Sequence, residues 1–228
     1  MLFRSALRRV FLERPSKRLV VACFASHIHR IQQIIDVAIE QGRKIALLGR
    51  SMEANVKLAR KLNLLHVDSA EFIDIENMSR YEPGDVCVIC TGSQGEPLAA
   101  LTKLARGDAR YMQVNGDDTV VLSSHPIPGN EWSVGRVIDD LHRLGTEVID
   151  SSHEPVHASG HARQGELRTL HQLVRPRHFI PIHGEFRHLI HHGNISISMG
   201  LDAERLLICE DGDIFDRALF PHFSGPPC

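Results

Sequence analysis

The chain has 228 residues, a formal net charge of −2, and 43% apolar and 24% charged residues. This length allows one large domain or one and a half small ones, and the composition excludes a disordered chain. Because the net charge is close to zero, an anionic partner must meet a local basic patch. No apolar run reaches the roughly 20 residues of a membrane helix, and residues 1–18 lack the apolar stretch of a secretory signal, so we expect no membrane partner.

An alternation of short apolar runs and helical patterns follows the chain. It predicts a first amphipathic helix over residues 1–14, and then strands at 19–24, 44–48, 85–90, 118–123, 146–150 and 178–182. Helices are expected at 28–41, 52–62, 130–144, 163–174 and 185–192, with a further helix that opens at Pro97 and a final hairpin that turns at Asp211-Gly212. Strands that are apolar on both faces and alternate with helices predict a parallel sheet covered on both sides.

The loops that follow the predicted strands consist mainly of Ser, Thr, Gly and His. Ligands of an open parallel sheet bind beyond the carboxyl ends of its strands. Hydroxyl groups, exposed backbone N–H groups and helix N-termini suit an anionic phosphate. The segment TGSQGEP at residues 91–97 is the most informative of these loops, although it fits neither a Walker loop nor a dinucleotide fingerprint. Its alternative interpretation is a capped turn between a strand and a helix.

Three motifs that resemble metal sites are better explained by structure. Residues 153–157 read H-E-x-x-H, but Pro155 disfavours the helix that a zinc protease needs. The H-x-H at residues 27–29 begins a helix, where a capping or surface role is expected. Cys87 and Cys90 lie in one strand, whose alternation sends the two thiols to opposite faces of the core. The five cysteines, an odd number, favour free thiols in a reducing, cytoplasmic compartment.

A further group of histidines indicates a metal-binding or catalytic site. The chain holds fifteen histidines, and His157, His161 and His183 lie at the ends of neighbouring predicted strands. A strand that delivers a histidine to its carboxyl end positions a metal ligand or a catalytic imidazole. For a single histidine the commoner case is a partly buried ring with a backbone partner. Three such rings together favour a functional site.

Five segments, taken in chain order between about residue 19 and residue 216, resemble ribonuclease J. They are FASHIHRIQQIIDVAIEQGRKIALLGRSM, ICTGSQGEPLAAL, SSHPIPGNE, VHASGHARQGEL and RPRHFIPIHGEFRHL. This family belongs to the β-CASP group of nucleases with the metallo-β-lactamase fold. The resemblance implies an α/β fold in which a parallel-sheet β-CASP domain is followed by the returning part of a metallo-β-lactamase domain. The expected boundaries are 1–18 for a lead-in helix, 19–174 for the β-CASP domain, 175–218 for the returning part and 219–228 for a tail.

The resemblance also implies roles for particular residues. His183 resembles the metal ligand supplied after the β-CASP domain, and His161 the residue that contacts the scissile phosphate and serves as general acid. His157, Ser159 and Gly160 would grip an RNA phosphate. Further walls of the RNA channel would come from Ser26, Ser93, Gln94 and Gly95. A basic lining is expected from some of Arg30, Arg43, Arg50, Arg163, Arg168, Arg175, Arg177 and Arg187.

The implied reaction is hydrolysis of RNA, both 5′ to 3′ exonucleolytic and endonucleolytic, with two zinc ions that activate water and hold the phosphate. The family's main metal motif, H-x-H-x-D-H, is not found in the 228 residues. We therefore expect a fragment without the amino-terminal lactamase half, inactive alone, from a protein that acts on 5′-monophosphorylated single strands and forms a homodimer at full length. The alternatives are a non-catalytic phosphate- or nucleotide-binding α/β module and a degenerate subunit that pairs with a complete homologue.

Overall fold

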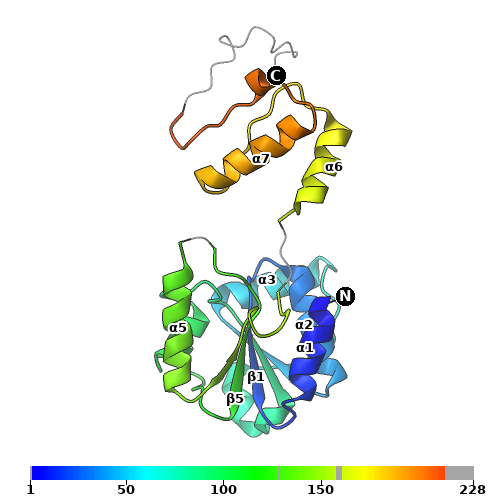
Figure 1. The fold of residues 1–228 in the computed structure, drawn as a ribbon. Coiled ribbons are helices and arrows are strands. Elements are labelled where there is room, and N and C mark those ends of the chain that lie inside the picture. Colours follow the sequence, from blue (N-terminus) through cyan, green and yellow to red (C-terminus); the bar gives the residue numbers. More distant parts are fainter. Residues whose placement is uncertain (1, 128, 158–160, 214–228) are drawn as a thin grey trace. The chain divides into compact units, whose positions relative to one another are not determined.

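The computed structural model describes residues 2–127, 129–157 and 161–213 (Figure 1). The chain divides into two compact units, residues 1–159 and 160–228, and each is described by itself. The division comes before the predicted domain boundary at 174/175, because the helix that ends at residue 174 packs within the second unit. Among the described residues, no helix is both long and apolar enough to cross a membrane.

The first unit is built on a six-stranded sheet in which every strand pair is parallel, as the sequence predicts. The strand order is β3-β2-β4-β1-β5-β6. β1, β4 and β5 form the centre, and all five residues of both β4 and β5 are buried. The bounds are β1 Arg18–Ala22, β2 Lys44–Leu48, β3 Phe72–Ile73, β4 Val86–Cys90, β5 Asp118–Leu122 and β6 Glu147–Ile149.

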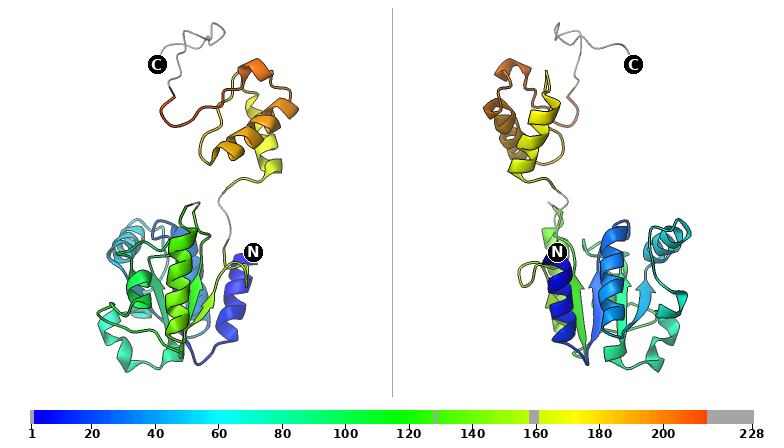
Figure 2. Two further views of the ribbon diagram at one scale, coloured as in Figure 1. Left: turned by 60° about the vertical axis from the view of Figure 1, so that its left-hand side comes forward. Right: turned by 90° about the vertical axis from the view of Figure 1, so that its right-hand side faces the viewer.

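Helices cover both faces of this sheet (Figures 1 and 2). Alternate residues of one strand enter different cores: Leu19 and Val21 pack under α1, α2 and α3, whereas Val20 and Ala22 pack under α4 and α5. The bounds are α1 Leu2–Leu12, α2 Ile28–Glu40, α3 Arg50–Lys61, α4 Ala100–Ala105 and α5 Glu131–Arg143. The predicted helices 1–14, 28–41, 52–62 and 130–144 are confirmed within two residues at their ends.

The cysteines of the sheet are core residues. Cys87 belongs to the core under α1–α3 and Cys90 to the core under α4 and α5, which confirms that their side chains take opposite faces. Cys23, Cys87, Cys90 and Cys209 are free thiols. Burial raises the pKa of Cys23 and of Cys87 to about 12.

Two arginines fix the amino-terminal edge of the sheet. Arg18 forms a bidentate ion pair with the fully buried Asp118, with Nε–Oδ1 at 2.6 Å and Nη2–Oδ2 at 3.0 Å. Arg43 is also buried, and its guanidinium donates to the carbonyl oxygens of Arg14 and Lys17 at 2.7 Å. Arg43 therefore cannot line an RNA channel, and this part of the sequence prediction is wrong.

The second unit consists of α6 (Gln164–Val174), α7 (Phe186–Ser198) and the 3₁₀ helix η4 (Ala203–Arg205). The predicted strand at 178–182 is wrong, because only Phe179 forms a bridge, parallel to Leu206. The rings of His171, Phe179 and His192 pack against one another with centroids 4.4–5.6 Å apart. These three rings form an aromatic cluster within the second unit, where a strand had been predicted.

Three local predictions need correction. The helix predicted to open at Pro97 begins at Ala100, because residues 97–99 form a turn. The helix predicted to end at residue 192 continues to Ser198. Residues 205–213 contain the predicted turn at residues 211–212 but no strand, and the rest of the predicted hairpin lies outside the described residues. β3 was not predicted from the sequence. Three 3₁₀ helices were not predicted either: η1 Ser69–Glu71, η2 Ile75–Arg80 and η3 Pro83–Asp85.

Candidate functional site

The topology creates a switch point between the neighbouring strands β1 and β4. The connection from β1 through α2 leads toward one edge of the sheet, and the connection from β4 through α4 leads toward the other. A crevice at such a point, outside the carboxyl ends of the strands, is the usual ligand site of doubly wound sheets. The loop 23–27 with Ser26 and the loop 91–99 with Ser93, Gln94 and Gly95 flank this point. The structure thus brings these four predicted residues together at the carboxyl ends of the strands.

His27 opens α2 as a capping residue. Its Nδ1 accepts a hydrogen bond from the backbone N–H of Arg30 at 3.2 Å. Desolvation, followed by the positive charge of Arg30, lowers the pKa of His27, so that the neutral, accepting form is favoured. The expected capping role of this H-x-H histidine is confirmed.

Gln94 joins the loop after β4 to the loop after β5. Its side chain is buried, and its Nε2 donates to the carbonyl oxygen of His125 at 2.8 Å and to Ser124 Oγ at 3.2 Å. Its Oε1 accepts from the N–H of Ile127 at 2.7 Å and from Asn130 Nδ2 at 3.4 Å. The amide therefore uses both donors and both acceptor positions inside the protein, and it joins the loop after β4 to the loop after β5.

Gly95 occupies a position that no other residue fits. Its φ is +71°, in the left-handed region, and an added Cβ would lie 2.6 Å from the carbonyl carbon of Ser133 in α5. The loop after β4 thus packs directly against the first turn of α5. This contact fixes the loop after β4 against that helix.

Arg30 lies at the same end of the sheet, where the strands have their carboxyl ends. Its side chain is buried (3% exposed), and its Nη1 donates to the carbonyl oxygen of Ser123 and lies 3.1 Å from His157 Nδ1. Ser123 Oγ donates in turn to the carbonyl oxygen of Val156 at 2.8 Å. Arg30 was expected in a basic lining, but these contacts place it beneath the loop that carries His157, where it supports that loop.

His157 is a half-buried imidazole in a positive environment. Its ring lies edge-on to that of His125 with centroids 4.6 Å apart, and Ser151 Oγ lies 3.0 Å from His125 Nδ1. Desolvation, followed by the charges of Arg30 and His125, lowers the pKa of His157 to about 4. The ring is therefore neutral near pH 7. Residues 151–157 form turns and irregular backbone and no helix, so the H-E-x-x-H match carries no zinc-protease geometry.

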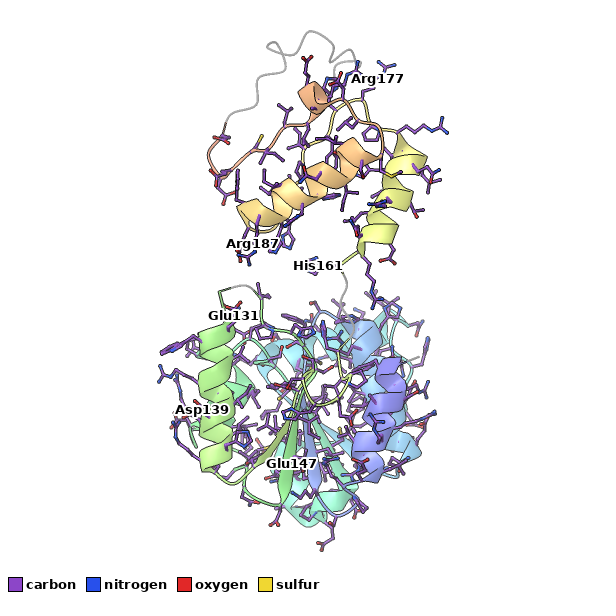
Figure 3. The ribbon with its side chains drawn as sticks, in the orientation of Figure 1. Glu131, Asp139, Glu147, His161, Arg177 and Arg187 are labelled. Carbon is purple, nitrogen blue, oxygen red and sulfur yellow. The ribbon has the colours of Figure 1, made fainter. Side chains whose placement is uncertain are left out.

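The second unit brings His161 and His183 together. Their rings are nearly parallel, at 12°, with centroids 5.4 Å apart (His161 is labelled in Figure 3). His183 has a φ of +69°, which is uncommon for a residue with a side chain and fixes where the ring leaves the chain. His188 Nδ1 then accepts from the N–H of Glu185 at the start of α7. The predicted Ser159 and Gly160 lie outside the described residues.

These residues do not form a zinc site by themselves. Zinc needs about four ligands, or three and a water. Within the described ranges, no group of three or more His, Cys, Asp or Glu side chains is placed to hold a metal ion. His161 and His183 supply two imidazoles at most, which is fewer than a zinc site requires.

The remaining predicted arginines do not gather at one place. Figure 3 shows Arg187 at the same end of the second unit as His161, and Arg177 at its other end. Arg187 pairs with Glu185, beside His183. Arg163 lies two residues from His161 in sequence, and Arg187 lies four residues from His183. The other predicted arginines of this unit are exposed as well: Arg163, Arg168, Arg175 and Arg177.

Comparison with protein families assigns both units. Residues 16–141 match the model of the ribonuclease J β-CASP domain, and residues 151–196 match that of the RNA specificity domain of Zn-dependent metallo-hydrolases. The doubly wound parallel sheet of the first unit is thus a β-CASP domain, and the helical unit that follows it is of the RNA specificity class. The chain belongs to the ribonuclease J family.

Relatives named ribonuclease J are similar along most of the chain. That of Mycolicibacterium smegmatis is 44% identical over 195 residues, which is 86% of this chain and 35% of the relative. That of Mycoplasma genitalium is 37% identical over 204 residues, or 89% and 36%, and that of Helicobacter pylori 37% over 196 residues, or 86% and 28%. The chain spans about a third of the length of these relatives.

Proposed function

We propose that the chain is the RNA-gripping and partly catalytic portion of a metal-dependent ribonuclease that hydrolyses RNA phosphodiester bonds. The match of residues 151–196 to an RNA specificity domain carries this proposal. It is supported by the His161–His183 pair within the second unit. We propose both 5′ to 3′ exonucleolytic and endonucleolytic cleavage of 5′-monophosphorylated single strands for the whole protein, with homodimerisation and a cytoplasmic location.

His161 would contact the scissile phosphate and protonate the leaving oxygen, and His157, Ser159 and Gly160 would grip a neighbouring phosphate. The lowered pKa of His157 keeps its ring neutral beside the Arg30 guanidinium. A neutral imidazole suits a role in which it binds phosphate by hydrogen bonding and not by charge. Ser26 and the loop of Gly95 would form further walls of the RNA channel. Gln94 and Ser93 would act through the shape of that wall, since Gln94 bonds within the protein.

We propose that His183 contributes one zinc ligand and that the other ligands come from outside the described residues. The purified 228-residue chain should therefore bind RNA but leave it uncut. The test is incubation of 5′-monophosphorylated, end-labelled RNA with the chain and added zinc or manganese, with and without a chelator. Robust cleavage that the chelator abolishes would refute inactivity of the isolated chain. No RNA binding at low salt would refute the gripping role itself.

The second candidate is a module that binds phosphate or nucleotide without hydrolysis. It is favoured by one observation: the described residues contain no three-ligand metal group. The variant His183→Ala separates the two candidates. A metal-ligand role predicts nearly unchanged RNA affinity in chelator, whereas a phosphate-gripping role predicts a clear loss under the same condition. His178→Ala is the matched control, because it removes an imidazole from the same unit.

A further inference from the structure

The one tryptophan of the chain lies exposed at the start of α5, next to the loops that follow β4 and β5. Trp132 is in the first turn of α5, and 72% of its surface is exposed. The buried residues of α5 are Val134, Val137 and Leu141, so the helix turns Trp132 away from the sheet.

The guanidinium of Arg136 packs on one face of the Trp132 indole. The guanidinium carbon of Arg136, one helical turn later, lies over the indole with 4.7 Å to the ring centroid. An indole that carries Arg on one face and meets solvent over most of its surface is a preformed flat platform. A neighbouring guanidinium also adds positive charge where a nucleotide phosphate would pass.

The position of this pair connects it with the loops that follow β4 and β5. Ser133, the next residue after Trp132, contacts Gly95 through its backbone. Asn130 contacts Gln94 at 3.4 Å. Figure 3 shows Glu131 at the end of α5 that adjoins these loops, with Asp139 farther along the helix. The carboxylate of Glu131 is engaged, since it accepts from the N–H of Gly129 at 2.7 Å.

We propose that Trp132 and Arg136 form a base-stacking subsite for single-stranded RNA beside the loops that follow β4 and β5. This proposal rests on the proposed function and deepens it. One unpaired base would stack on the indole, while Arg136 faces the strand's backbone. Stacking accepts any base, so the subsite would hold the strand without selecting its sequence. The exposed Leu98 and Ile127, on the two loops joined by Gln94, would extend the apolar rim.

Because the chain has a single tryptophan, its fluorescence reports on this subsite directly. Titration of the full chain with oligoadenylate should quench the emission of Trp132. An abasic oligonucleotide of the same length should leave it unchanged, because it offers charge without rings. Binding itself is followed independently by the anisotropy of fluorescein-labelled RNA.

Variants complete the test. Trp132→Leu should weaken RNA binding about tenfold, since one base stack is lost, and Trp132→Phe should recover most of the affinity. Arg136→Gln should weaken binding and reduce its salt dependence. Leu144→Ala, an exposed apolar residue at the other end of α5, is the matched control and should change nothing.

Two results would overturn the subsite while the proposed function stands: RNA binding by anisotropy without quenching, or unchanged affinity in Trp132→Leu. Emission that shifts with protein concentration in the absence of RNA would identify a second copy of the chain as the occupant and would also overturn it. Absence of RNA binding by anisotropy at any salt concentration would refute the proposed function together with the subsite.

Discussion

The Nη1 atom of Arg30 lies 3.1 Å from Nδ1 of His157, across 127 positions of sequence. The guanidinium is buried and also contacts the carbonyl oxygen of Ser123 at the end of β5. One side chain of α2 thus connects a central strand with the loop that bears a predicted phosphate-gripping histidine. Stability and site geometry should therefore respond together when Arg30 is changed.

Replacement of Arg30 by Met should destabilise the first unit by about 2 kcal/mol, because the carbonyl oxygen of Ser123 loses a buried donor. RNA affinity should fall as the loop of His157 loosens. Urea denaturation and anisotropy measure the two effects. The control is Arg50→Met, an exposed residue of α3, which should change unfolding little. Equal stability of the two variants would contradict a supporting role for Arg30.

The depressed pKa of His157 predicts a specific pH dependence. The unfolded imidazole titrates near 6.5 and the folded one near 4, so between these values the unfolded chain binds more protons. The free energy of unfolding should therefore fall as the pH drops from about 6.5 to about 4, and this contribution should level off below that window. His157→Gln should flatten the slope measured by urea denaturation at a series of pH values. Part of the slope should persist, because the pKa values of His27 and His192 are also lowered. An identical slope in the variant would contradict a depressed His157 pKa.

A different carboxylate should act at lower pH. Hydrogen bonds from Arg14 lower the pKa of Glu147 to about 2. Its contribution to stability is present above pH 4.5 and is lost as the pH falls toward 2. Glu147→Gln should flatten this acid limb while it leaves the limb between pH 4 and 6.5 intact. A change confined to the upper limb would show that the two groups had been assigned wrongly.

The buried ion pair at the amino-terminal edge should be among the most sensitive positions. Asp118→Asn leaves the Arg18 guanidinium facing an amide and should cost roughly 3–5 kcal/mol. Thermal and urea unfolding measure the loss. Asp140→Asn is the matched control: Asp140 pairs with the exposed Arg143, so less than about 1 kcal/mol is expected. Similar costs in the two variants would contradict the difference in burial.

Zinc affinity tests the incomplete ligand set. With two imidazoles at hand, the chain should bind zinc with a Kd weaker than about 1 μM, well short of structural zinc sites at roughly 10–16 kcal/mol. Calorimetric titration measures it, and His183→Ala should weaken it further. Tight binding that survives this substitution would show that other side chains hold the ion.

The alternation of strands and helices was readable because buried strands and amphipathic helices leave long, regular patterns. Shorter features escaped: β3 has two residues and depends on pairing with β2. The helix predicted at 185–192 continues through Gly193, which lies within α7. A Cβ there would approach Leu206 Cδ2 to 2.8 Å, so the glycine serves packing and does not end the helix. That requirement is set by a residue 13 positions away and is invisible locally.

The candidate site was predicted by residue type more than by role. Histidines at the predicted strand ends led to His161 and His183, and the family resemblance gave them roles and added Ser26 and Gly95 as walls of the RNA channel. The burial of Arg30 could not be predicted from the sequence, because arginine side chains are usually exposed. Its buried partner, a carbonyl oxygen, is known only from the fold. Trp132 was missed altogether, although its position off the apolar face of α5 was available as a signal.

The distribution of the thiols has a practical consequence for spectroscopy. Cys23, Cys87 and Cys90 are enclosed and resist deprotonation, whereas Cys209 is partly accessible. In a Cys228→Ser background, a maleimide dye should therefore attach to one position, in the second unit. Such a dye and the native indole of the first unit would make a donor–acceptor pair for following how the two halves of the molecule respond to RNA.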